Sequence, residues 1–249
     1  MRTLTLLRPV ALLHFLMMIV LLGGCSARGL VKAGLDVDKA DAPQMLMVAT
    51  PDFVIQEVDV GRNSERVVKW EQQAGKAFED AVLRLSDKGK KFAVVSPSVL
   101  TEEETQVLVQ HRALFATMAP QLLQIKEGAV EVWADEKRKF AYTLGPGLGF
   151  LKTKYNVDAL VVVIGKDTVR SGARIALDII NSVLPGAVSG EASHAYLISA
   201  IVDTGSGDIL LFDYDAAKRR QLSNQSDVSS MADEVMTDYR RMLKKGAWF

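Results

Sequence analysis

The chain has 249 residues, and its 30 basic and 30 acidic side chains give a formal net charge of zero. A neutral chain has no long-range field that would attract nucleic acid, so we expect no nucleic-acid partner. The hydrophobic content of 49% is sufficient for a folded core and too high for a disordered chain.

The first 24 residues have the pattern of a secretory signal. A basic start precedes a short apolar run over 10–22, which is too short to cross a bilayer as a mature helix. The following Leu22-Gly-Gly-Cys25 resembles the lipobox of bacterial lipoproteins, in which the signal is cut before the cysteine and lipid is attached to it. Cys25 is the only cysteine, which excludes an internal disulfide. We therefore expect a signal peptide over 1–24 and lipidation of Cys25.

The same resemblance implies a location. Ser26, rather than aspartate, follows Cys25, which is similar to the sorting pattern of outer-membrane lipoproteins. The expected location is the bacterial outer membrane, periplasm-facing and held by the lipid on Cys25. Residues 27–43 have no clear period, so 25–43 is interpreted as a lipidated flexible tether.

The first half of the expected domain begins with a strand over Met45–Ala49 and Phe53–Ile55, interrupted by Pro51. Apolar positions three and four apart then predict a helix over Ser64–Leu85. A second strand is expected at Phe92–Val95.

Thr101 and Glu104 form a capping box that predicts the start of the next helix. This box explains the acidic cluster there without a metal or acid site. Residues 129–143 fit either a helix or two short strands around a charged turn, and the helix is preferred. The glycine-rich run Gly145–Gly149 should then break the chain before a short helix that ends near Tyr155.

The last third predicts the centre of the sheet. The β-branched run Leu160–Ile164 is typical of a strand buried on both faces. Ala195–Val202 and Asp208–Tyr214 should form a hairpin, and Asp227–Lys245 a closing helix. The expected fold class is α/β: a single three-layer-like domain over 44–249, with a mixed β-sheet flanked by helices and a C-terminal β-hairpin plus closing helix.

Two stretches carry a family resemblance. Asn156–Val163 matches an "ADxxLxG"-type strand, and Ile201–Leu210 matches an "lvDxxTGeilw" hairpin. With the lipobox, the chain resembles envelope lipoproteins related to the amino-terminal domain of TolB and to the curli-secretion lipoprotein CsgG. The resemblance covers about the last hundred residues and implies a module that assembles with itself or with envelope partners.

Sets of residues typical of catalysis are not found. His111 and His194 have no partners at metal spacing or in a triad pattern. Gly145–Gly149 and Gly165–Thr168 depart from the spacing of nucleotide-binding loops. We therefore expect no enzyme activity, no cofactor and no metal, while a strand-end loop is the most plausible place for a ligand.

The apolar stretch Ser171–Gly190 has two interpretations: a buried crossover helix, or a surface for self-association, a partner or the membrane. The candidate contact residues are Ile175, Ile179, Ile180, Val183 and Leu184. The expected function is a non-catalytic envelope assembly, secretion or scaffold component that contacts envelope proteins or itself. The alternatives are a periplasmic small-ligand-binding module and, less favoured, an envelope hydrolase.

Overall fold

The computed structural model describes residues 30–31, 44–86, 92–127, 140–173, 175, 194–217 and 220–245. The described strands are β1 (Leu30–Val31), β2 (Met45–Val48), β3 (Asp52–Val58), β4 (Ser64–Arg66), β5 (Ala93–Val95), β6 (Ala159–Arg170), β7 (His194–Asp203) and β8 (Ile209–Ala217). Among the described residues, the α-helices are α2 (Val68–Ser86), α3 (Glu102–Glu127), α5 (Gly149–Tyr155) and α7 (Gln225–Lys245), and two 3₁₀ turns are η1 (Pro97–Val99) and η2 (Pro146–Leu148).

These strands form one mixed sheet in the order β1-β8-β7-β6-β2-β5, with β3 also paired to β6 and β4 paired to β3. Strands β2, β3 and β5 run parallel to their neighbours β6 and β2, whereas β7, β8 and β1 add antiparallel. The expected mixed α/β domain with a C-terminal hairpin is therefore confirmed, and the run Leu160–Ile164 lies in the central strand β6.

Strands β2 and β3 lie end to end along the same side of β6. Leu46 pairs with Ala159 near the start of β6, and Asp52 resumes the pairing at Ile164. The break falls at Pro51, which has no N–H to give to a ladder. The proline therefore divides what the sequence suggests as one bent strand into two.

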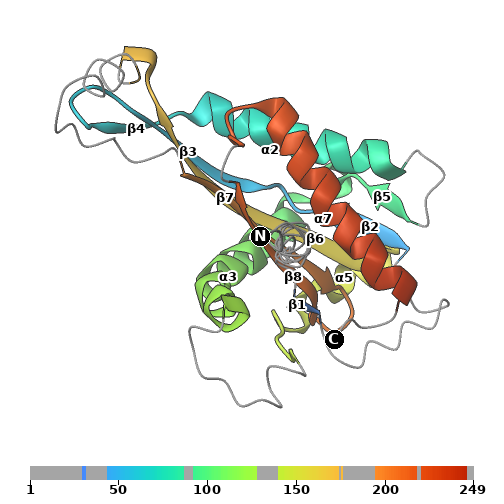
Figure 1. The fold of residues 1–249 in the computed structure, drawn as a ribbon. Helices are drawn as coiled ribbons and strands as arrows, with labels where there is room; N and C mark the ends of the chain where they lie inside the picture. The colour runs from blue at the N-terminus through green and yellow to red at the C-terminus, as the bar shows by residue number, and fades with distance from the viewer. Residues whose placement is uncertain are drawn as a thin grey trace, which may run out of the picture.

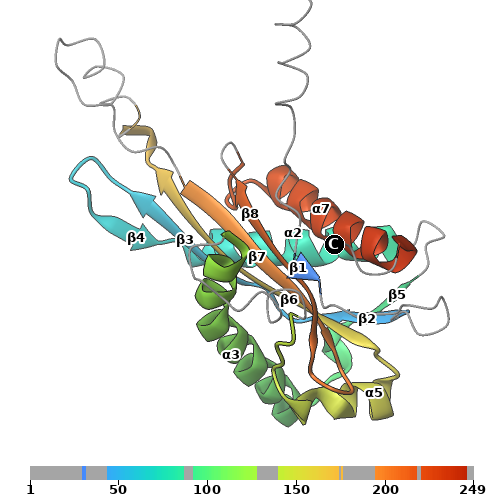
Figure 2. The same cartoon turned by 60° about the horizontal axis from the view of Figure 1, so that its bottom comes forward.

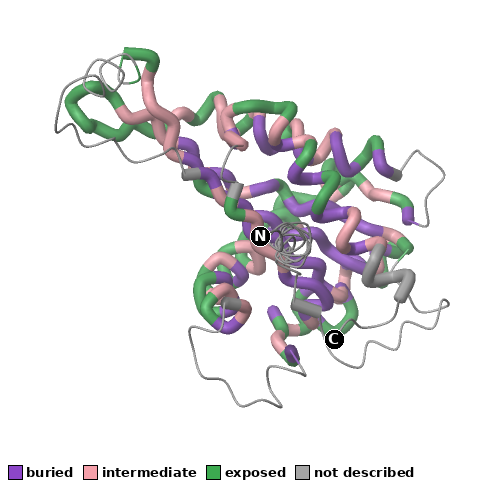
Figure 3. Tube along the Cα trace, in the orientation of Figure 1, coloured by how far each residue is buried: buried purple, intermediate pink, exposed green. Residues whose placement is uncertain are grey.

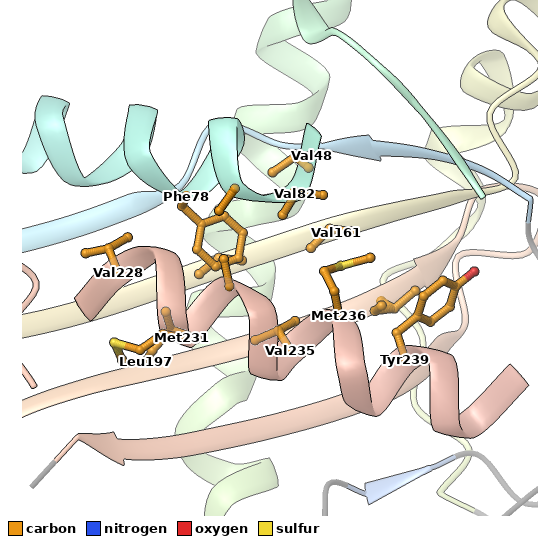
Figure 4. Packing of buried hydrophobic residues seen from close by; sticks show 14 of the residues in the cluster. Val48, Phe78, Val82, Val161, Leu197, Val228, Met231, Val235, Met236 and Tyr239 are labelled. Carbon is orange, nitrogen blue, oxygen red and sulfur yellow. The ribbon is translucent and has the colours of Figure 1, made fainter. Parts of the chain in front are cut away.

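Helices cover both faces of the sheet, which gives the expected three layers (Figure 2). On one face, α2 and α7 pack together, and Phe78, Val82, Val235 and Tyr239 from these helices meet sheet residues such as Val161 (Figure 4). The opposite face is covered by α3 and α5. Each face thus has its own apolar cluster, joined through the shared sheet.

Two side-chain contacts fix α3 in place. Its N-terminus has the expected capping box, because the Glu104 amide donates to Thr101 Oγ1 (3.3 Å) and the Thr101 amide donates to Glu104 Oε2 (2.9 Å). Glu104 also accepts from Lys154 (2.7 Å) and from the Tyr155 hydroxyl (2.6 Å), which ties α3 to α5. These donors hold the pKa of Glu104 at about 2.

At the other end of α3, the Lys126 amine donates to Asp213 Oδ1 of β8 at 2.8 Å. The two side chains are only 8% and 12% exposed, so this ion pair is largely removed from water. The ion pair holds the C-terminal end of α3 against the middle of β8.

The helix predicted from Ser64 begins later, at Val68, because Ser64–Arg66 pairs with β3 as strand β4. The Glu71 carboxylate stabilises this turn of the chain by accepting from Arg66 Nε (2.7 Å) and from the Ile55 amide (3.0 Å). The predicted start of this helix is therefore wrong, because residues 64–66 form a short strand instead. The pairing of that strand depends on residues distant in sequence.

The preferred helix over 129–143 is wrong for its described part. Residues 140–143 are not helical: Phe140 has a positive φ of 37°, and Thr143 forms an isolated bridge with Asp208 in the β7–β8 turn. Residues 128–139 lie outside the described residues. The competing strand interpretation is closer, because the backbone of this segment is satisfied by the hairpin rather than by its own helical turn.

Part of the expected tether is paired to the sheet. Leu30 and Val31 form β1, which runs antiparallel to β8 with Leu30 opposite Phe212 and Val31 opposite Leu211. Edge strands expose unpaired backbone groups that readily accept another strand. No helix among the described residues has both the length and the apolar character needed to cross a bilayer.

Candidate functional site

A three-stranded ribbon projects beyond the helices. We define the ribbon as residues 56–66 of β3, its turn and β4, together with residues 168–171 at the end of β6 (Figure 1). Toward the body, Phe53 and Ile55 are buried, whereas Gln56–Val58 are half-buried and β4 is exposed (Figure 3). Among the described residues, the ribbon is therefore held by strand pairing rather than by a helix packed on it.

The tip of the ribbon is a well-defined turn. Asp59 Oδ1 accepts from the Asn63 amide (2.9 Å), and the Asp59 amide donates to the Asn63 carbonyl (3.0 Å). Arg62 adopts a left-handed backbone conformation with φ of 65°. Val60, inside this turn, is 44% exposed. A rigid turn thus presents an apolar side chain to solvent.

The predicted contact segment leaves from this same end of the molecule. The Ser171 amide donates to the Val58 carbonyl (3.0 Å), and the Ile175 amide donates to the Ser171 carbonyl (2.9 Å). Ile175 is 48% exposed. Of the five candidate contact residues, Ile175 alone is described, and Ile179, Ile180, Val183 and Leu184 lie outside the described residues.

Strand register excludes the crossover interpretation of this segment. Strands β6 and β7 are antiparallel neighbours, and Thr168 near the end of β6 lies opposite His194 at the start of β7. A crossover connects parallel strands, whereas adjacent antiparallel strands need only a short turn. Residues 171–193 therefore connect two neighbouring strand ends at the ribbon.

A shallow hollow of about 230 Å³ lies at the carboxyl ends of the parallel strands β2 and β5. Its lining residues are Ala49, Thr50, Pro97, Ser98, Leu100, Thr105, Leu108, Val109 and Arg112. Strand ends of this kind are where α/β proteins commonly bind ligands. The volume is below the roughly 300–1,000 Å³ that is typical of small-molecule sites.

Arg112 is the charged side chain of this hollow, and it already has protein partners. Its Nη1 donates to the Thr50 carbonyl (2.7 Å), and its Nε lies 3.7 Å from Asp52 Oδ2. These contacts tie α3 to the break between β2 and β3. The residues of the hollow therefore serve to connect α3 to the sheet. The hollow does not favour the small-ligand-binding alternative.

Asp167 is a fully buried acid on the opposite face. Its Oδ2 accepts from the amides of Leu222 (2.7 Å) and Ser223 (3.4 Å), which hold the turn that leads into α7. Burial raises the pKa of Asp167 above its ordinary value. The carboxyl group lines no hollow described above, and its contacts hold the turn before α7 in place.

His111 and His194 lie in separate parts of the molecule. His111, on α3, has its Nδ1 2.8 Å from the Val107 carbonyl and packs so closely on Gly147 that a Cβ there would lie 2.6 Å from the imidazole. His194 starts β7 at the ribbon. Within the described ranges, no three His, Cys, Asp or Glu side chains are grouped so that they could hold a metal ion.

The glycine-rich run has a packing role. Gly145 and Gly207 both have positive φ, and a Cβ added to Gly207 would lie 1.9 Å from the Gly145 carbonyl oxygen. The Leu144 amide donates to the Gly207 carbonyl (2.8 Å). The run therefore crosses the tip of the β7–β8 hairpin at backbone contact, which only glycine permits.

Comparison with known proteins identifies no family for this chain. No family model matches the chain, and no curated protein matches it either. Among solved structures, the crystal structure of lipoprotein GNA1162 from Neisseria meningitidis matches with a TM-score of 0.32 and 11% identity, covering 82% of this chain and 100% of that one. The neighbour is a bacterial lipoprotein, but a TM-score this low carries no conclusion about function. The expected grouping with TolB- and CsgG-related lipoproteins stays a prediction.

Proposed function

We propose that this protein is a lipid-anchored, non-catalytic component of the bacterial cell envelope that works through protein contacts at the ribbon tip. The observation that carries the proposal is the ribbon itself, with the connection 171–193 at its end. The proposed anchor is Cys25 in the outer membrane, with the domain in the periplasm. The partner is an envelope protein or a second copy of the chain.

The ribbon combines the two properties that a contact element needs. Strand β3 pairs with β6 along its whole length, from Asp52 opposite Ile164 to Val58 opposite Arg170, which makes the support stiff. At the tip, Val60 and Ile175 expose apolar surface on elements that have no function in the core. Exposed apolar surface that the core does not require is typical of interaction sites.

Site-specific photo-crosslinking tests this proposal. A photoreactive amino acid at Val60 should give a discrete cross-linked product in intact cells of the bacterium that carries the gene. The matched control is Val109 on α3, which is similarly exposed at 38% and lies away from the ribbon. Equal products from the two positions, or none at Val60 and Ile175, would contradict a contact surface at the tip.

A paired substitution tests the apolar segment. Ile179→Glu with Leu184→Glu should abolish the cross-link from Val60 while leaving the urea midpoint of the purified chain unchanged. Loss of folding would assign the two side chains to the core. Retention of both folding and the cross-link would place the contact surface elsewhere.

The anchor has its own test. Labelled palmitate should enter the wild-type chain and not the Cys25→Ser variant, because the thiol is the proposed site of lipid attachment. Density fractionation of the labelled protein then tests the outer-membrane location. Equal labelling of both chains would disprove the anchor at Cys25.

A further inference from the structure

The β1–β8 pairing sets how far the folded domain can lie from its anchor. From Cys25 to Leu30 the chain reaches at most about 17 Å when fully extended. Without β1, the first residue held by the folded domain would be Gln44. The fully extended chain from Cys25 to Gln44 would then reach roughly 65 Å. Because Leu30 is held opposite Phe212, the shorter limit, from Cys25 to Leu30, applies.

We infer that the membrane surface is itself a contact surface of this protein, and that lipid headgroups cover the β1–β8 edge of the sheet. The inference rests on the proposed lipid anchor at Cys25. An anchored cysteine lies at the level of the headgroups, which form a layer of about 5–8 Å on each side of the hydrocarbon core. A maximum reach of about 17 Å leaves no room for a wide aqueous gap between that layer and the edge.

The edge is firmly joined to the body, so the short link restrains the whole domain. Phe212, opposite Leu30, is fully buried, and its ring lies 6.3 Å from Phe115 of α3 and 6.4 Å from Phe140. The next residue, Asp213, binds Lys126 at the end of α3. A force applied through β1 is therefore passed to β8 and from there to the helix layer.

The sheet order then fixes which parts face away from the membrane. Five strand spacings separate β1 from β5 at the opposite edge, which is roughly 24 Å. Along the strands, Leu211 lies opposite Ile201 and Ile201 opposite Val161. From Val161 to the ribbon end at Arg170 is about 30 Å. The ribbon tip is thus remote from the anchored edge both across the strands and along them.

The chemistry of this contact differs from electrostatic membrane binding. Without Arg2 and Arg8 of the expected signal, the chain from Cys25 onward has 28 basic and 30 acidic side chains and a formal net charge of −2, so anionic lipid gives no general attraction. The contact is imposed by the covalent anchor and the short link. Vesicles of zwitterionic phosphatidylcholine should therefore be sufficient, and the contact should be insensitive to salt.

Fluorescence quenching in vesicles tests the inference. The chain starting at Cys25 is coupled through its single thiol to a maleimide phospholipid in phosphatidylcholine vesicles that contain a headgroup quencher. A fluorescent amino acid is placed at Ala216, an exposed residue of β8, or at Ala93, the matched exposed alanine of the opposite edge strand β5. Quenching should be stronger at Ala216. Equal quenching at both positions would overturn the inference.

A release variant separates the pairing from the anchor. Leu30→Pro removes a backbone donor from β1 and should abolish the excess quenching at Ala216, with the urea midpoint showing that the domain stays folded. If Leu30→Pro unfolds the domain, a Gly/Ser insertion between Ser26 and Ala27 gives the same test. Retained excess quenching after the insertion would contradict the role of the short link.

Failure of the inference and failure of the proposed anchor give different results. Chemical coupling supplies the lipid in vitro, so the quenching result depends only on the geometry of the domain. Absence of palmitate labelling in cells would remove the anchor, and with it the membrane contact in the cell, even if the coupled protein shows the expected quenching pattern.

Discussion

Replacing Gly207 by alanine should destabilise the domain by about 3 kcal/mol. The residue has φ of 78°, and a Cβ there would lie 1.9 Å from the Gly145 carbonyl oxygen. The positive φ alone costs roughly 1–2 kcal/mol for a residue with a Cβ. The backbone contact must also separate, which breaks the hydrogen bonds from Leu144 to Gly207 and from Ile209 to Tyr142, both 2.8 Å. Each such bond contributes about 0.5–1.5 kcal/mol.

Gly205, in the same turn, provides the matched control. It does not have positive φ, and a Cβ there would meet only the flexible Asp203 carboxylate at 3.3 Å. Gly205→Ala should therefore change the unfolding free energy by less than about 1 kcal/mol. Urea unfolding of the chain from Ser26 onward, followed by circular dichroism, measures both variants. If Gly207→Ala costs no more than Gly205→Ala, the close crossing of the hairpin is refuted.

Three further predictions concern buried or paired charges. Because Lys154 and its neighbour hold the pKa of Glu104 at about 2, below the ordinary 4.5, that contribution to stability is present above pH 4.5 and is lost as the pH falls toward 2. Glu104→Gln should remove this part of the pH dependence of the urea midpoint. Asp167→Leu leaves two backbone amides before α7 without their acceptor and should cost about 3 kcal/mol, with Asp167→Asn costing less. Lys126→Met leaves Asp213 unpaired and should cost about 3 kcal/mol, which Lys126→Met with Asp213→Leu should largely restore.

Local patterns in the sequence were sufficient for the elements whose signal is carried by neighbouring residues. The capping box at Thr101–Glu104, the β-branched run of β6 and the polar turn of the β7–β8 hairpin all form as expected. In each, the side chains that determine the structure lie within a few residues of one another. The mixed sheet follows from the order of these elements.

The errors occurred where pairing between distant residues overrides the local pattern. Ser64–Arg66 continues the helical spacing of α2, but it is extended because it pairs with β3 and because Arg66 binds Glu71. The segment 129–143 fits a helix locally, yet Thr143 within it bridges to Asp208, far along the chain. Propensity and spacing contain no information on either partner.

The candidate contact segment illustrates the limit of sequence reasoning about the site. Its apolar residues were evident, but whether the segment connects parallel or antiparallel strands depended on the relative direction of β6 and β7. The register of Thr168 opposite His194 determines that direction. No pattern within 171–193 could have shown it. Likewise, nothing in the sequence of residues 27–43 distinguishes Leu30–Val31 from the rest of the expected tether.

The positions of the anchored edge and the ribbon have a mechanical consequence. Both β8, through β7, and the ribbon, through β3, are attached to opposite sides of the single long strand β6. A force between a membrane at β1 and a partner at Val60 would therefore be transmitted through β6, both across the strand and along it. The first five residues of β6 are fully buried. Strands sheared along their length resist through many hydrogen bonds at once, and of the twelve residues of β6, ten pair with β7 and seven with β3. The proposed anchor and contact surface therefore predict that the fold holds a partner at a fixed distance from the membrane.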